Sequence, residues 1–445
     1  MKKLILGLTA ILLLTAVHAQ DGKKAYRDAK KAFSTYNLDP TGNKAQLSEA
    51  ATQIDVALQD AEIAQDPTAW ALKGEIFNEV ANQIVAVRQL GIGSLDELPK
   101  VDHPAHKAAE AYMKSYELAE KKWQTKDALK GFQQAQGHLS NMGIFFYEDQ
   151  DYDSALENFQ MVIELHDKLK ADGEASSLDS EDGTNEGYNN QLYITGLAAL
   201  NAGKPEAASG YFRKLYDMKY EKPAIYEALY KIEADKDRAA AYKYLEEGRK
   251  LFPDDVSILF AEINHFLAIN ELDKLIDKLE QGIAKEPDNV SLYSTLGNVY
   301  DNLHQKEMEA GNTEKAQEYF DKALAQYQKA IEKDPSYSDA LYSIGALYYN
   351  KAAAMTQELN KYADDYSKEG LKKYEELKKK IFEEFDKALP YFQKAEARNP
   401  SDMNTLIALK EIYARKDNLE MSNEFKERLD KVQAGETIGT PYFKQ

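Results

Sequence analysis

The sequence predicts an all-α fold in which pairs of antiparallel helices are stacked along the chain. Three observations predict this class. Proline recurs at long intervals, and Pro253 and Pro287 are 34 residues apart. Between the prolines, apolar residues are spaced by three and four, which places one apolar stripe on each helix. The chain has 445 residues and no cysteine. Its length therefore suits a long repeat array, and no disulfide can stabilise it.

Composition excludes several classes of function. The chain carries 75 acidic and 56 basic residues, which give a formal net charge of −19. Nucleic acids and anionic membranes select surfaces with clustered Lys and Arg, so we expect no nucleic-acid partner. Hydrophobic residues make up 43% of the chain, too many for a disordered acidic tail. Without cysteine there is no thiolate metal site and no catalytic thiol.

Residues 1–19 have the pattern of a secretory signal peptide. Lys2 and Lys3 precede an apolar run that ends at Val17, and small residues follow, which predicts cleavage near Ala19. The run is shorter than the roughly 20 residues needed to cross a bilayer, so we expect no membrane span in the mature chain. Because no cysteine follows the run, we do not expect a lipoprotein. We expect an exported protein, located in the periplasm or associated with the cell envelope.

The second half of the chain contains the clearest repeats. A first helix carries large apolar residues around a glycine and ends on an aromatic residue. A second helix carries alanines around an aromatic residue, and a proline follows. The example after Pro287 comprises Tyr293, Leu296, Gly297 and Tyr300, then Ala323, Tyr327 and Ala330. Glycine or alanine lets two helices approach closely, and proline ends the pair. This pattern resembles the tetratricopeptide repeat (TPR) family, which implies a right-handed superhelical solenoid of helix-turn-helix units with lengthened hairpins.

The same pattern predicts the organisation of the chain. We expect an N-terminal helical hairpin over residues 20–66, about eight TPR hairpins over residues 67–433, and an exposed C-terminal tail over residues 434–445. Several pairs are longer than the family's unit. Insertions are expected near residues 78–107, 171–189, 301–314 and 349–380. The last of these predicts a projecting hairpin with its tip near residues 360–370. The insertion near residues 171–189 predicts an acidic loop.

Motifs for catalysis or metal binding are weak. His103 and His106 lie close in sequence beside Asp102, but zinc would need a further ligand that the segment does not supply. The acidic loop departs from the EF-hand pattern, because its glycine comes one residue early. Motifs of serine hydrolases, zinc proteases, phosphate-binding loops and dinucleotide-binding folds are missing from the sequence. We therefore expect no enzyme, no metal and no cofactor.

The first helix of each hairpin usually lines the concave side of such an array. If positions 4, 8 and 11 of that helix are buried, positions 5, 9 and 12 face the groove, because successive residues are rotated by roughly 100°. These positions are rich in aromatic and asparagine side chains, which suit peptide recognition. The candidates are Tyr193, Tyr226, Tyr230, Phe260, Asn264, Asn298, Tyr342 and Tyr349. A second interpretation stays open, in which these tyrosines pack between neighbouring repeats.

The leading functional hypothesis is a non-enzymatic scaffold of the periplasm or cell envelope that binds a partner protein or peptide through this groove. One alternative is a chaperone-like assembly factor for exported or outer-membrane proteins. Another is a carbohydrate-binding or catalytic protein that uses the groove aromatics against sugars. Some TPR proteins bind a peptide carboxylate with Lys and Asn, but Ser294 stands where Lys would accompany Asn298. We therefore do not expect that mode of binding.

Overall fold

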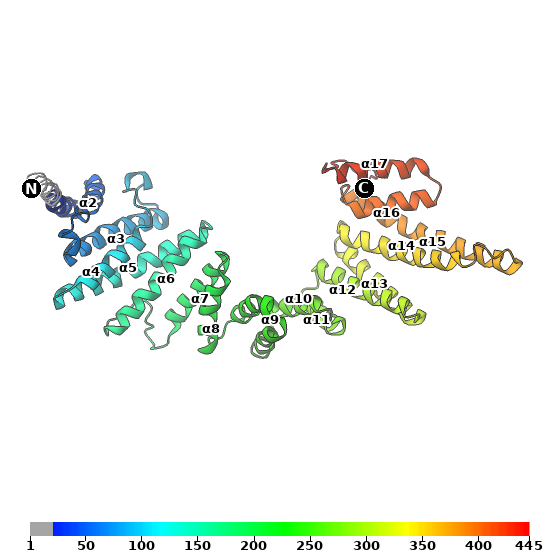
Figure 1. Cartoon of the computed structure of the whole chain (residues 1–445), viewed down its shortest axis with the longest axis horizontal. Coiled ribbons are helices and arrows are strands. Elements are labelled where there is room, and N and C mark those ends of the chain that lie inside the picture. The colour runs from blue at the N-terminus through cyan, green and yellow to red at the C-terminus, as the bar shows by residue number, and fades with distance from the viewer. Residues whose placement is uncertain (1–20, 445) are drawn as a thin grey trace, which may run out of the picture. The chain divides into compact units, whose positions relative to one another are not determined.

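The computed structural model describes residues 21–444, and every regular element in this range is a helix (Figure 1). The predicted all-α class is confirmed. The chain divides into two compact units, one ending at Leu251 and the other beginning at Phe252. The predicted signal peptide, residues 1–19, lies outside the described range. Within that range, no helix is both long enough and apolar enough to cross a membrane.

The first unit is a series of consecutive helix pairs. It begins with a helix over residues 21–38. The elements that follow are α2 (Lys44–Ala57), η1 (Ile63–Gln65), α3 (Pro67–Leu90), η2 (Leu95–Glu97), α4 (Pro104–Leu118), α5 (Lys122–Glu148), α6 (Tyr152–Ala171), α7 (Glu186–Asn201), α8 (Pro205–Asp217) and α9 (Pro223–Leu251). The backbone of α9 is non-helical at Asp237, with φ −152° and ψ 92°, so this element is two helices joined at a kink. The sequence predicts two helices of one hairpin in this region.

The second unit continues the pairing. Its helices are α10 (Val256–Ala268), α11 (Leu272–Lys285), α12 (Val290–Glu309), α13 (Thr313–Lys333), α14 (Ser338–Asn360), α15 (Lys368–Arg398), α16 (Met403–Arg415) and α17 (Leu419–Gln433). The turn between α12 and α13 contains Gly311, whose φ of 79° favours glycine. The long helices α14 and α15 are joined at residues 361–367, where the sequence predicts the tip of a projecting hairpin.

Close contacts between a glycine and an aromatic ring hold the helix pairs together. The ring of Tyr112, on α4, lies against both Gly74 on α3 and Gly131 on α5. A Cβ atom at Gly74 would stand 2.5 Å from that ring, and one at Gly131 would stand 2.3 Å from it. Tyr327 lies against Gly297 in the same way. The small residues of the repeat pattern therefore admit the large rings of neighbouring helices, as the sequence predicts.

The acidic loop between α6 and α7 is anchored to the helices. Asp179 accepts hydrogen bonds from the backbone N–H of Ser176 at 2.8 Å and from Lys170 at 3.0 Å. The buried side chain of Gln136, on α5, accepts from the hydroxyl of Ser176 at 3.1 Å. Leu178 is buried in the core of the first unit. The loop is thus packed against α5 and α6 rather than being a freely solvated linker.

The C-terminal segment differs from the exposed tail that we expected. The backbone N–H groups of Tyr442 and Phe443 donate to the carboxylate of Glu396, with N–O distances of 2.7 to 3.1 Å. Glu396 is 0% exposed. The ring of Phe443 stacks on Phe425 with centroids 5.6 Å apart. The backbone N–H of Ile438 donates to the Ser401 hydroxyl at 2.8 Å. The segment therefore covers the apolar end of the last hairpin, because α17 would otherwise leave Phe425 open to water.

Candidate functional site

The predicted groove residues are divided between the two units. Tyr193, Tyr226 and Tyr230 belong to the first unit, and the other five belong to the second. Tyr226 and Tyr230 are each 4% exposed. The ring of Tyr226 packs edge-on against Tyr216 at 5.8 Å, and the hydroxyl of Tyr230 accepts a hydrogen bond from Arg238 at 3.3 Å. For these two tyrosines, packing between helices describes the structure better than an open groove.

The remaining candidate groove residues are more exposed to solvent than Tyr226 and Tyr230. Tyr193 and Phe260 are half-buried, and Asn264 is exposed. Lys222 lies over the Tyr193 ring, with its Nζ 4.7 Å from the centroid. The structure brings Asn298 and Tyr342 together as lining residues of a cavity of about 290 Å³ in the second unit. Asn298 accepts a hydrogen bond from the Tyr327 hydroxyl at 2.7 Å.

Tyr349 lies on α14, the same helix as Tyr342, and its ring packs toward α15. Its ring is 5.4 Å from that of Phe385 on α15. The ring of Tyr342 is 5.6 Å from that of Phe392, also on α15. Both tyrosines are half-buried, so each side chain packs against α15 on one side and is exposed to solvent on the other.

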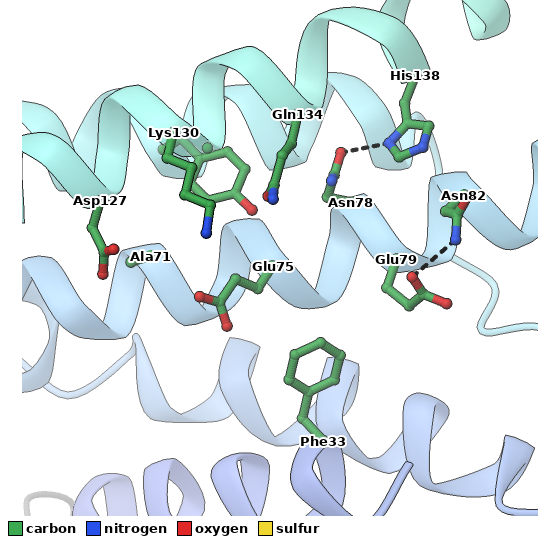
Figure 2. Close-up of a pocket in the computed structure, with 12 residues that line it drawn as sticks. Phe33, Ala71, Glu75, Asn78, Glu79, Asn82, Asp127, Lys130, Gln134 and His138 are labelled. Atoms are coloured by element: carbon green, nitrogen blue, oxygen red, sulfur yellow. Dashed lines mark hydrogen bonds between the residues drawn. The ribbon is translucent and has the colours of Figure 1, made fainter. Parts of the chain in front are cut away.

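A larger pocket lies in the first unit, and none of the eight predicted groove residues lines it. Its volume is about 500 Å³. It is bounded by the helix over residues 21–38, by α3 and by α5, which are the first helices of three successive pairs (Figure 2). The lining combines carboxylates, amides and aromatic rings. The lining includes Phe33, Glu75, Asn78, Glu79, Asn82, Tyr112, Asp127, Lys130, Gln134 and His138.

One end of this pocket is held by internal hydrogen bonds. The Tyr36 hydroxyl donates to the Glu79 carboxylate at 2.7 Å, and the Asn82 amide donates to it at 3.0 Å. The Nδ1 atom of His138 lies 2.8 Å from the Asn78 side-chain oxygen (Figure 2). Because an amide oxygen only accepts, we assign Nδ1 as the donor. Burial lowers the pKa of His138, which keeps its ring neutral near pH 7.

The other end holds charged groups with no such partners. Glu75 and Asp127 are exposed, and neither forms an ion pair or a side-chain hydrogen bond with any residue of the range 21–444. Figure 2 shows Lys130 pointing from α5 toward Glu75 on α3, with Phe33 facing them from the neighbouring helix. Desolvation in the concave surface and the charge of Asp127 raise the pKa of Glu75, whereas Lys130 and Lys30 oppose that rise.

Tyr112 forms part of the pocket's floor. Its side chain is 2% exposed, and its hydroxyl has no hydrogen-bond partner among the described residues. Burial, followed by the charges of Glu75 and Asp127, raises the pKa of this hydroxyl. The hydroxyl therefore lies in the field of both carboxylates, toward the charged end of the pocket. Since the ring is fixed between Gly74 and Gly131, it cannot turn away without moving a helix.

The sequence contains signals for this pocket outside the predicted groove residues. Counting from the half-buried Trp70 as position 4, positions 9 and 12 are Glu75 and Asn78. The contribution of α5 comes from the part of this helix that precedes Leu139, where the repeat pattern begins. There, charged and polar residues are spaced by three and four on one helix face. They are Asp127, Lys130, Gln134 and His138.

The weak metal candidates have structural roles. His103 precedes α4 with a left-handed φ of 49°, and its ring stacks on Phe146 at 5.1 Å. Asp182 in the acidic loop accepts from the backbone N–H and the hydroxyl of Thr184. Across residues 21–444, no group of three or more His, Asp or Glu side chains is arranged to hold a metal ion.

Comparison with known proteins identifies the repeat. A family model described as TPR repeat matches residues 311–351, which cover α13 and the first part of α14. No curated protein matches the sequence closely enough to count as a relative.

Solved structures resemble parts of the chain. The C-terminal part of a TPR repeat-containing protein from Cytophaga hutchinsonii is 13% identical, over 66% of this chain and 95% of its own, with a TM-score of 0.41. YrrB, described as a TPR protein with an unusual peptide-binding site, is 16% identical over 50% of this chain and 92% of its own, with a TM-score of 0.33. MamA from Desulfovibrio magneticus RS-1 is 20% identical over 43% and 96%, with a TM-score of 0.31.

Proposed function

We propose that this chain, with its TPR repeat, is a non-enzymatic scaffold that binds a peptide segment of a partner protein along the first helices of its N-terminal unit. The observation that carries this proposal is the pocket between residues 21–38, α3 and α5. It is concave, it spans three successive repeats, and it displays side chains that form no hydrogen bond or ion pair with other residues of the range 21–444. Such a surface suits an extended segment, which can contact one repeat after another.

The chemistry of the pocket suits a peptide backbone. Side-chain amides offer a donor and an acceptor in one group, which matches the N–H and C=O groups of an extended chain. Gln134 is exposed at the pocket and forms no hydrogen bond with any described residue. Asn78 and Asn82 are held in place by His138 and Glu79. Rigid polar groups lose little freedom when a ligand binds, so this arrangement favours specific binding.

The experiment that tests this function is site-specific cross-linking in the native cell. A photo-reactive residue at Gln134 reports the pocket, and one at Glu157 is the control, because Glu157 is exposed on the second helix α6. We expect a discrete partner adduct at position 134 and none at position 157. Adducts of equal intensity at both positions, or none at position 134, would overturn the pocket as the binding surface. A broad mixture of exported proteins at position 134 would favour the chaperone-like assembly factor instead.

We also propose that the scaffold acts outside the cytoplasm, in the periplasm or at the cell envelope. The support is the sequence pattern of residues 1–19, with two lysines followed by an apolar run. The protein isolated from its native cell should begin near Gln20, and it should be released with the periplasmic fraction. Cell fractionation followed by intact-mass measurement of each fraction checks both points. A full-length chain in the cytoplasmic fraction would contradict this location without affecting the pocket.

A further inference from the structure

We infer that the N-terminal pocket binds an arginine side chain of the partner segment, with the guanidinium between the carboxylates of Glu75 and Asp127 and the hydroxyl of Tyr112 as a third acceptor. This inference rests on the proposed function, because the bound segment brings the arginine to the pocket. It specifies which side chain of the bound segment the pocket recognises.

The charges in the pocket favour a cation. The lining carries three carboxylates, Glu75, Glu79 and Asp127, against the single ammonium group of Lys130. Glu79 already accepts hydrogen bonds from three side chains, those of Tyr36, Asn82 and Gln83. Glu75 and Asp127 accept none from the described chain. Two accessible carboxylates that repel each other across a concave surface are stabilised when a cation enters between them.

The buried hydroxyl of Tyr112 is a second observation that favours an arginine ligand. A buried polar group without a partner is unfavourable, and native structures rarely leave one. Neither neighbouring glycine can supply a side-chain partner, and the ring is fixed between them. An N–H donor at the charged end of the pocket would satisfy the hydroxyl oxygen. The unpartnered hydroxyl is thus an observation independent of the carboxylates, and it also calls for a donor.

Geometry favours arginine over lysine. A guanidinium presents five N–H groups in one plane, so it can donate in several directions to acceptors on different helices, whereas an ammonium acts as a compact charge. Glu75 lies on α3, Asp127 on α5 and Tyr112 on α4. Phe33 faces the pocket from the helix over residues 21–38, and its ring lies between Glu75 and Glu79 in Figure 2. A guanidinium can stack on such a ring, and its weak hydration lowers the cost of leaving water.

The charge of Lys130 leads to a prediction opposite in direction to that for the carboxylates. Its ammonium points toward Glu75 and lowers the pKa of that carboxyl. Lys130 therefore already neutralises part of the negative charge that a bound arginine would neutralise. Removing this charge should strengthen arginine binding, whereas removing a carboxylate should weaken it. A residue that only supports the fold would show no such opposite pair of effects.

The test uses the full-length mature protein and fluorescent 12-residue peptides with arginine at the centre, each with twins that carry citrulline or lysine there. Citrulline keeps the shape of arginine and removes its charge. We expect the arginine peptides that bind to lose at least tenfold in affinity on changing to citrulline. Glu75→Gln and Asp127→Asn should each weaken arginine binding about tenfold, and Lys130→Gln should strengthen it several-fold. Glu157→Gln removes the same charge away from the pocket and should change affinity less than twofold.

Tyr112→Phe separates ligand binding from folding. This change removes only the unpartnered hydroxyl, so the melting temperature should stay the same or rise while arginine binding weakens several-fold. Equal binding of arginine and citrulline twins, or of arginine and lysine twins, would overturn the inference. If a partner still cross-links at position 134 in that case, the proposed function stands and only the arginine assignment fails. If no partner cross-links there, the proposed function itself fails.

Discussion

At the scale of single residues, glycines decide how closely the helices of neighbouring repeats approach. Gly131, on α5, lies against the Tyr112 ring, and an added Cβ atom would stand 2.3 Å from it. Gly137 lies further along the same helix, and an added Cβ atom there would meet nothing within 4 Å. The two positions share a helix and a residue type, and they differ only in their surroundings.

This difference predicts opposite effects of one substitution. Gly131→Ala should lower the free energy of unfolding of the first unit by about 1–3 kcal/mol, because a fully packed ring must move. Gly137→Ala should raise it by about 0.5–1 kcal/mol, because alanine loses less backbone freedom in a helix. Urea denaturation followed by tryptophan fluorescence measures this, since the two tryptophans, Trp70 and Trp123, both lie in the first unit. Effects of the same sign at both glycines would contradict the packing argument.

The raised pKa of Glu75 predicts how partner binding depends on pH. Desolvation and Asp127 raise this pKa above its ordinary value, so the carboxyl gains its proton at a higher pH than an exposed glutamate does. Because the proposed site needs the ionised form, affinity should fall as pH decreases through this raised pKa. The same shift makes the folded state bind the proton more tightly than the unfolded state, so this group favours folding more as pH falls. Peptide titrations between pH 4 and 8 should therefore weaken at low pH, and the Glu75→Gln variant should lose that part of the profile.

At the scale of elements, the docked C-terminal segment depends on one buried carboxylate. Glu396, on α15, accepts from two backbone N–H groups of the segment and from Arg428 of α17 at 3.2 Å. Arg428 also pairs with Glu424 at 2.8 Å, but the Glu424 side chain is 37% exposed whereas that of Glu396 is fully buried. The same arginine thus has a buried and an exposed carboxylate partner.

Glu396→Ala should therefore cost about 2–4 kcal/mol, because it leaves the backbone N–H groups of Tyr442 and Phe443 without an acceptor and removes the buried partner of Arg428. Arg428 keeps its ion pair with Glu424. Glu424→Ala should cost at most about 1 kcal/mol, because solvent screens an exposed pair. Hydrogen exchange by mass spectrometry should show faster exchange in residues 438–443 and in α17 for the first variant only. If residues 438–443 exchange at the unprotected rate in the parent protein, the segment is not docked in solution.

The sequence predicts those features of the elements that are encoded locally. The pairing of α12 with α13 follows from a glycine turn and an apolar stripe of period three and four, both visible within a few residues. The docking of the C-terminal segment has no such signal, because Tyr442 meets Glu396 across 46 residues of chain. A segment with two glycines and a proline looks like a tail until its partner on another helix is known.

The site was harder to predict than the fold, for two physical reasons. The rule for groove positions assumes that every first helix turns the same face outward, but Tyr226 and Tyr230 are 4% exposed because neighbouring helices cover them. The pocket depends on three helices lying side by side, so its carboxylates, Glu75 and Asp127, come from separate repeats. Applied to the first repeat, the same counting would have found Glu75 and Asn78, but not the part contributed by α5.

At the scale of the whole molecule, the net charge of −19 acts on a partner before contact. A basic segment is attracted over a distance set by the screening length, which is about 30 Å at 0.01 M salt and about 8 Å at 0.15 M. Long-range attraction mainly raises the association rate, whereas contacts inside a site mainly set the dissociation rate.

These two contributions should therefore separate in a kinetic experiment. For an arginine-bearing peptide, the association rate constant should fall at least tenfold between 0.01 and 0.15 M salt, because the field of the whole chain is screened. The Glu75→Gln variant removes one unit of a large net charge, so its association rate should change little, but its dissociation rate should rise about tenfold. Stopped-flow fluorescence measures both constants, with the citrulline twin as the control for non-electrostatic binding. An association rate that does not respond to salt would show that the net charge plays no part in binding the partner. If Glu75→Gln changed only the association rate, Glu75 would contribute only to the long-range field and would not contact the ligand.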